Sequence, residues 1–201
     1  MKSLIAFALA AATTLFCLPV RAQAPQPPEI AARQYMLLDV TTGQVLAERD
    51  ADTPTDPASL TKLMTAYVVF GALRDKKIAL EQPVPVSVRA WDERKGDPSL
   101  MFIDTTMRPT VDELLHGMIV VSGNDASVAL AELVGGSVEN FVAMMNRQAQ
   151  AWGLKNTAFT NVTGMTQSGH RASARDIATI AARIVRDCPQ EHARYYGPTE
   201  H

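Results

Sequence analysis

Residues 56–65 read Asp56-Pro57-Ala58-Ser59-Leu60-Thr61-Lys62-Leu63-Met64-Thr65, and they predict the start of an apolar helix. Asp56 suits the N-cap position, and Pro57 suits the first helical position, where the N–H that proline lacks would have no intrahelical partner. The apolar residues that follow recur at helical spacing: Leu60, Leu63, Met64, Tyr67 and Val68. This spacing predicts that one face of the helix is buried in the core.

Ser59 and Lys62 carry the chemistry of this segment. Ser59 falls in the first helical turn, where backbone N–H groups lack intrahelical partners, and Lys62 lies one turn later on the same face. A desolvated amine can lose its proton near neutral pH and deprotonate a hydroxyl, while an N–H at the helix end stabilises a developing oxyanion. The pair therefore indicates acyl transfer. A Ser-x-x-Lys pair also arises by chance about once in a chain of this size, so a solvated polar helix face is the alternative interpretation.

The composition is that of a globular protein. The chain has 201 residues, of which 47% are hydrophobic and 20% are charged, and this is enough to bury one substantial core. The formal net charge is −2, and the sequence contains no long run of Lys or Arg. These features argue against nucleic acid as the main partner.

The N-terminal residues predict export. Residues 1–22 combine a positive start, an apolar run and small or apolar residues before a cleavage site after Ala22, which is typical of a signal peptide. The apolar run is shorter than the roughly 20 residues that a membrane anchor needs. Residues 23–32 form a Pro-rich lead-in, and residues 33–201 are expected to form the folded domain. We expect an exported protein of the periplasm or cell envelope, in which Cys188 is a buried, unpaired cysteine.

The folded part predicts a hairpin followed by helices. Residues 35–39 and 45–48 read as two strands joined by a turn, and residues 84–88 and 100–103 as short strands or extended segments. A capping box at Thr110 starts a helix that stops at residue 122. Further helices are predicted from residue 124 to 135, from 137 to 152, and from a cap at Ser173 to Cys188, followed by an irregular tail. An isolated hairpin is marginal in water, so strands that complete the sheet are expected outside this chain.

A second motif, Ser122-Gly123-Asn124, lies in the break between two predicted helices. Taken alone it is a common turn sequence. Together with Ser59-x-x-Lys62 it resembles the serine penicillin-recognising acyl transferases, whose motifs occur in the order Ser-x-x-Lys, Ser-x-Asn and Lys-Thr-Gly. Longer segments, from about residue 35 to 188, are similar to the low-molecular-mass penicillin-binding proteins that act as D-alanyl-D-alanine carboxypeptidases. These segments are 35–39, 43–48, 56–65, 122–126, 153–157 and 173–176.

The resemblance implies an α+β fold of the β-lactamase/transpeptidase type, present here as the N-terminal hairpin and the helical subdomain. It implies that Ser59 is the acyl-ester nucleophile on a peptidoglycan stem peptide ending in D-Ala-D-Ala, and that Lys62 is its general base. Ser122 would relay a proton to the leaving amine, and the Asn124 amide would hold Lys62 and the substrate. Neither a metal nor another cofactor is implied. Penicillin and other β-lactams would acylate the same serine, and the parent protein would associate with the membrane through a C-terminal segment absent here.

The sequence departs from the family pattern in one respect, because no Lys-Thr-Gly or Lys-Ser-Gly follows Asn124. We therefore interpret the chain as the N-terminal portion of a carboxypeptidase, and a catalytically inert fragment that binds cell-wall peptide is the alternative. A β-lactamase is disfavoured because residues 160–169 contain no carboxylate to position a deacylating water. A metallohydrolase is disfavoured because the histidines lack ligand spacing and are expected to be exposed or partly buried: His116, His170, His192 and His201.

Overall fold

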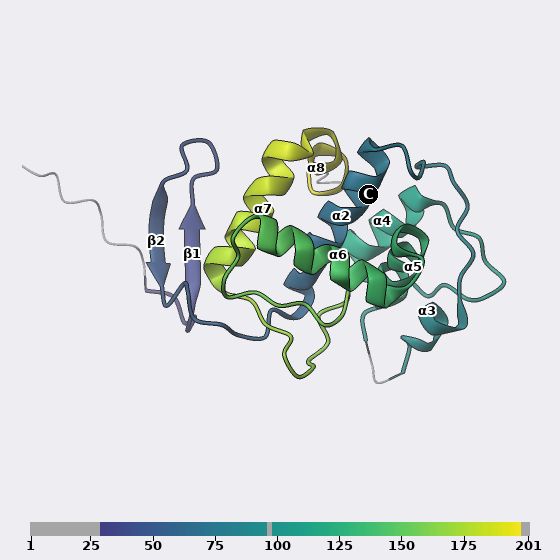
Figure 1. Cartoon of the computed structure of the whole chain (residues 1–201), viewed down its shortest axis with the longest axis horizontal. Helices are drawn as coiled ribbons and strands as arrows, with labels where there is room; N and C mark the ends of the chain where they lie inside the picture. Colours follow the sequence, from purple (N-terminus) through teal and green to yellow (C-terminus); the bar gives the residue numbers. More distant parts are fainter. Residues whose placement is uncertain (1–28, 96–97, 198–201) are drawn as a thin grey trace, which may run out of the picture. The chain divides into compact units, whose positions relative to one another are not determined.

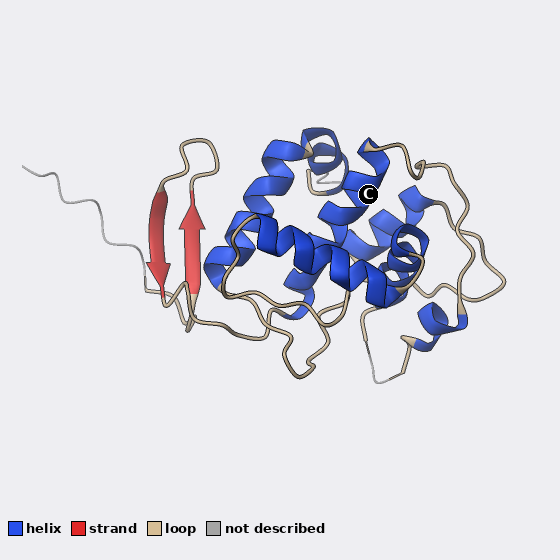
Figure 2. Ribbon diagram, in the orientation of Figure 1, coloured by secondary structure: helices blue, strands red, loops and turns tan. Residues whose placement is uncertain are grey.

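The computed structural model describes residues 29–95 and 98–197, and the predicted signal peptide lies outside this range. The hairpin is present (Figures 1 and 2): β1 (Tyr35–Leu38) pairs antiparallel with β2 (Val45–Arg49). Gly43 occupies the turn with φ of +76°, which glycine adopts at no steric cost. The Asp39 carboxylate accepts the Thr41 N–H at 2.8 Å and fixes the turn. The predicted hairpin is therefore confirmed.

Helices make up most of the remaining structure. A 3-10 helix, η2 (Ala58–Thr61), leads directly into α2 (Lys62–Arg74). The other helices are α3 (Val88–Asp92), α4 (Val111–Val120), α5 (Asn124–Gly135), α6 (Val138–Ala151), α7 (Ala174–Asp187) and α8 (Pro189–Tyr195). Helix α2 contacts α4, α5, α6 and α7, and α5 contacts α2, α3, α4 and α6, so these two helices lie at the centre of the helical layer.

The core follows from this central position of α2. Met64, Val69 and Phe70 of α2 are fully buried. They belong to one hydrophobic cluster with fully buried side chains of the surrounding helices: Leu114 and Leu115 of α4, Leu130 of α5, Phe141 and Met145 of α6, and Ile180 of α7. Burial of these large apolar side chains is the main driving force that holds the helices together.

Local signals position the helix ends as expected. The Thr110 hydroxyl accepts the Glu113 N–H, and the Glu113 side chain accepts the Thr110 N–H, which is the predicted capping box. Ser137 and Ser173 cap α6 and α7 in the same way through one hydroxyl each. Gly136 ends α5 with φ of +74°. The predicted bounds of α4 to α7 are confirmed to within about two residues.

Three expectations about local structure are wrong. Asp56 does not cap the first helix, because Pro57 takes the N-cap position of η2 and the Asp56 carboxylate accepts the Thr166 hydroxyl at 3.5 Å. Of the two alternatives for residues 84–88 and 100–103, the strand is wrong: the Val84 N–H donates to the Pro109 carbonyl oxygen, Val88 begins α3, and the Met101 N–H donates to the Asp125 carboxylate. The tail beyond Cys188 is not irregular, because Pro189 starts the short helix α8.

The hairpin packs against the helices at α7, because β1 lies beside this helix (Figure 1). Arg175 of α7 donates to Glu48 of β2 at 2.6 Å and to Asp52 at 2.8 Å. Within the described ranges, no single helix is long and apolar enough to cross a membrane. Helices α5 and α6, bent by 83° at their junction, reach that length and composition only when taken together.

Replacing Leu114 by Ala is expected to lower the free energy of unfolding by about 2–5 kcal/mol, because it leaves a cavity in the core around α2. Val120→Ala, at a half-exposed position of the same helix, is the matched control and is expected to cost less than about 1 kcal/mol. Urea denaturation followed by far-UV circular dichroism measures both. Equal losses in the two variants would contradict this placement of α4.

Candidate active site

Ser59 lies in η2, and Lys62 is the first residue of α2, so the two share one turn. The Ser59 side chain is exposed, and the Lys62 Nζ atom lies 3.2 Å from the Ser59 Oγ atom. Ala58, just before the serine, has φ of +48°, an unusual backbone conformation for a residue with a Cβ atom. The predicted serine–lysine pair is therefore in hydrogen-bonding contact, although in a 3-10 turn and not in the first turn of an α-helix.

Ser122 completes a chain of three polar groups. It follows α4, and its hydroxyl donates to the Ser59 Oγ atom at 2.9 Å, across 63 positions of sequence. Its φ of +59° is again in the left-handed region, where non-glycine residues cluster at functional sites. Gly123 follows, and a Cβ atom there would lie 3.0 Å from the Met101 backbone nitrogen. The break between α4 and α5 thus directs the Ser122 hydroxyl at the Ser59 hydroxyl.

Lys62 is buried, with 5% of its surface exposed. Its amine donates to the Thr163 carbonyl oxygen at 2.7 Å as well as to Ser59. Burial lowers the pKa of Lys62 to about 8, although the negative charge of Glu93 opposes the shift. An amine with this pKa is partly neutral at physiological pH, which a general base must be.

Asn124, the third residue of the second motif, is buried at the start of α5. Its backbone N–H donates to the Ser99 carbonyl oxygen at 2.9 Å. In the described part of the chain the hydrogen bonds of the Lys62 amine go to Ser59 and Thr163. A direct hold of the Asn124 amide on Lys62 therefore stays a prediction.

Asp125 and the backbone of the loop at residues 158–171 were not expected as parts of the site. The buried Asp125 carboxylate accepts the N–H groups of Met101 at 2.9 Å and Ile103 at 3.1 Å, and so fixes the segment that covers residues 123–125. An acidic residue is common in the first turn of a helix, so the sequence around Asp125 does not predict that its carboxylate binds the backbone of residues 101–103. Backbone carbonyls such as that of Thr163 carry none either, because every residue has one.

The loop at residues 158–171 is pressed against the Ser59 turn. The Val162 carbonyl oxygen accepts the Thr65 hydroxyl at 2.9 Å. Gly164 has φ of +89°, and a Cβ atom built on it would lie 1.8 Å from the Ala58 carbonyl oxygen. Only glycine allows this approach, so the loop and the turn fit each other through their backbones.

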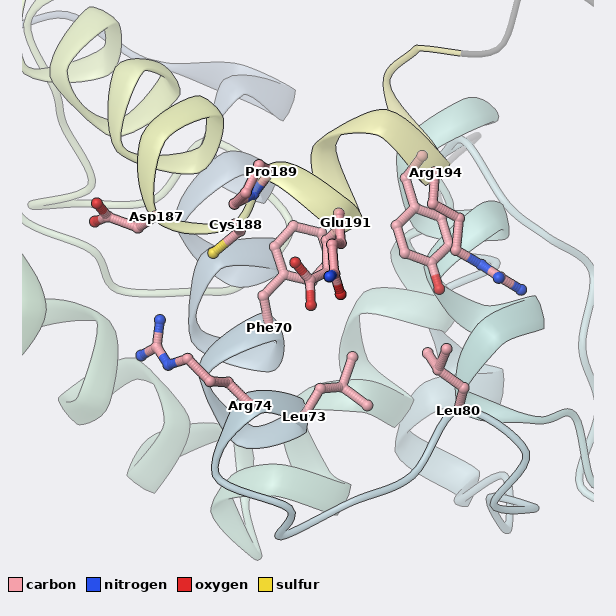
Figure 3. Close-up of a pocket in the computed structure, with 11 residues that line it drawn as sticks. Phe70, Leu73, Arg74, Leu80, Asp187, Cys188, Pro189, Glu191 and Arg194 are labelled. Carbon is pink, nitrogen blue, oxygen red and sulfur yellow. The ribbon is translucent and has the colours of Figure 1, made fainter.

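Two cavities lie along α2. One of about 450 Å³ has Ser59, Lys62 and Ser122 in its wall, together with Leu63, Met118 and Tyr196. The other, of about 680 Å³, lies between α2, α7 and α8 and contains none of the predicted site residues (Figure 3). Charged side chains of both signs surround it, and the thiol of Cys188 has its pKa raised to about 11, chiefly by burial. The expectation of a buried cysteine is confirmed.

The part of the chain that the structure describes contains no group of three or more His, Cys, Asp or Glu side chains placed to hold a metal ion. One expectation about the histidines is wrong, because His170 is buried, with 3% of its surface exposed.

Comparison with known proteins gives consistent matches. The family model of D-alanyl-D-alanine carboxypeptidases matches residues 21–200. The D-alanyl-D-alanine carboxypeptidase DacA of Haemophilus influenzae is 46% identical over 169 residues, which is 84% of this chain and 43% of that protein. DacA of Escherichia coli is 42% identical over 183 residues, covering 89% of this chain and 45% of that protein. The chain thus spans less than half the length of these relatives.

Solved structures agree with the sequence matches. Penicillin binding protein 5 of Haemophilus influenzae is 46% identical, with a TM-score of 0.81 over 84% of this chain and 49% of that one. A mutant of the Streptomyces K15 DD-transpeptidase is 31% identical, with a TM-score of 0.72 over 78% of this chain and 62% of that one. The predicted α+β fold of the transpeptidase type is confirmed, with the hairpin and the helical layer present. The chain belongs to the D-alanyl-D-alanine carboxypeptidase family.

Proposed function

We propose that the chain carries the residues that form the acyl-enzyme of a serine-type D-alanyl-D-alanine carboxypeptidase, with Ser59 as the nucleophile. The substrate is a peptidoglycan stem peptide ending in D-Ala-D-Ala. The observation that carries this proposal is the contact of the Ser59 Oγ atom with the Lys62 amine at 3.2 Å and with the Ser122 hydroxyl at 2.9 Å. Membership of the family supports the substrate class.

The reaction divides into two acyl transfers. The neutral Lys62 amine takes the Ser59 proton while the Ser59 oxygen bonds to the carbonyl carbon of the penultimate D-alanine. The Ser59 backbone N–H, in the first turn of η2, is assigned to the developing oxyanion. A proton passes through Ser122 to the leaving nitrogen, the C–N bond breaks and D-alanine departs. Water then attacks the ester, and the Ser59 oxygen regains a proton.

The same geometry supports acylation by penicillin, because opening of a β-lactam ring also needs a nucleophile and a proton for the leaving nitrogen. The expectations of a signal peptide at residues 1–22 and of a cell-envelope location agree with this substrate and stay proposals. Membrane association of the parent protein and the absence of a nucleic-acid partner also stay predictions.

A second candidate function is a fragment that binds cell-wall peptide without turning it over. It is favoured by one observation, the absence of Lys-Thr-Gly after Asn124 in these 201 residues. The resemblance implies that the third motif supplies a second oxyanion donor, and a site without one such donor is typically slower by about a hundred- to a thousandfold. Covalent labelling by penicillin separates the two candidates, because a binding fragment without acylation leaves no covalent product.

Replacing Ser59 by Ala is expected to abolish covalent labelling by a fluorescent penicillin, since among the described residues the Lys62 amine contacts no other hydroxyl. Ser122→Ala is expected to slow labelling by about a hundred- to ten-thousandfold, the usual contribution of a general acid–base group. Ser168→Ala, at an exposed position, is the matched control and should label like the unsubstituted chain. Labelling of folded Ser59→Ala at the rate of the unsubstituted chain would contradict the assignment.

The labelling rate is expected to rise about tenfold per pH unit up to a pH of about 8 and then level off, because only the neutral Lys62 amine accepts the proton. The sign follows from burial, which lowers the pKa of this amine and brings its neutral form into the accessible range. Stopped-flow or quench measurements between pH 6 and 9.5 give the profile. Lys62→Arg, which stays protonated throughout, should remain inactive at every pH, and a profile that rises only near pH 10 would refute a depressed pKa.

A further inference from the structure

His170 is a buried polar side chain that the proposed reaction does not use. It lies at the end of the loop at residues 158–171, and both of its ring nitrogens are in contact with other residues. The Thr160 backbone N–H donates to the His170 Nδ1 atom at 3.1 Å. The His170 Nε2 atom lies 2.8 Å from the Thr61 hydroxyl.

These two contacts fix the protonation of the ring. A backbone N–H can only donate, so Nδ1 must be the acceptor and the ring hydrogen must be on Nε2. The Nε2–H group then donates to the Thr61 hydroxyl oxygen. Only the neutral imidazole satisfies both partners, and burial, which lowers the pKa of His170, favours this neutral form.

The contact with Thr61 brings His170 to the catalytic turn. Thr61 is fully buried and stands immediately before Lys62. The same loop supplies the Thr163 carbonyl oxygen that accepts from the Lys62 amine at 2.7 Å. The loop therefore contacts the turn at two neighbouring points. His170 contacts Thr61, and the Thr163 carbonyl oxygen contacts the Lys62 amine.

We propose that His170 is a positioning residue for Lys62: by linking Thr160 to Thr61 it holds the loop closed over the Lys62 amine and keeps water from it. The inference rests on the proposed function, because it concerns the base of that reaction. If the loop opened, the amine would regain water and its charged form would be favoured. Fewer molecules would then carry a neutral base at pH 7, and acylation would slow although His170 touches neither Ser59 nor substrate.

The test measures the pKa of Lys62 directly, from the 13Cε chemical shift of the chain labelled with 13C-lysine, with Lys62→Arg used to assign the signal. His170→Phe fills the site without either hydrogen bond and should raise the pKa of Lys62 by about one unit or more, with an acylation rate at pH 7 about tenfold lower. His170→Asn keeps an acceptor near Nδ1, and His170→Gln keeps a donor near Nε2. Both should give smaller shifts.

Two further variants complete the set. Thr61→Val removes the partner hydroxyl with little change in volume and should raise the pKa of Lys62 in the same direction, which keeps the proposal testable if His170→Phe fails to fold. His116→Gln, a change of another partly buried histidine outside the loop, is the matched control and should leave the Lys62 titration unchanged.

An unchanged Lys62 pKa in folded His170 and Thr61 variants, with only a lower melting temperature, would overturn the proposal and leave His170 a structural residue. A Lys62 pKa near 10.5 in the unsubstituted chain would also overturn it. A Lys62 pKa of about 8 in the unsubstituted chain that rises in the His170 variants supports the inference whether or not penicillin labels the protein. Absence of labelling in that case would count against the proposed function alone.

Discussion

The site depends on the burial of one amine. Lys62 begins the helix around which the core is packed, and its side chain has almost no contact with solvent. Burying a charged ammonium is costly, so the amine releases its proton more readily than in water. The Thr163 carbonyl and the Ser59 hydroxyl satisfy its hydrogen bonds at 2.7 Å and 3.2 Å. The same burial that costs stability therefore makes Lys62 suitable as a base.

The surrounding backbone explains how the amine stays covered. The loop at residues 158–171 approaches so closely that Gly164 has no room for a side chain. On the other side, Asp125 fixes the segment next to the Ser122 break. Ala58, which precedes Ser59 in the chain, and Ser122, whose hydroxyl contacts Ser59, both adopt positive φ angles. Strained conformations of this kind persist where the neighbouring structure holds them in place.

Much of the fold was predictable because its signals are local. The capping box of Thr110, the cap of Ser173 and the hairpin turn at Gly43 each act over three or four residues, so short patterns identify them. The wrong predictions concern competition between local and tertiary contacts. Asp56 has the chemistry of an N-cap, but the loop at residues 158–171 supplies Thr166 as a partner for its carboxylate, and Pro57 occupies the cap position.

The site was predictable in part for the same reason. Ser59 and Lys62 meet within one turn, so their spacing predicts their contact. Ser122 lies 63 positions away from Ser59, and only resemblance to a family connected the two motifs. The Thr163 carbonyl and the burial of His170 could not be predicted, since backbone groups are common to all residues and one histidine in a loop carries no spacing pattern.

The location of the covalent bond tests the central claim most directly. The chain is incubated with benzylpenicillin at pH 8, digested, and mapped by tandem mass spectrometry. We expect a penicilloyl adduct on the Ser59 hydroxyl, carried by the peptide that contains residues 56–65. Folded protein that carries no adduct, or an adduct on Ser122 or another residue in place of Ser59, would contradict it.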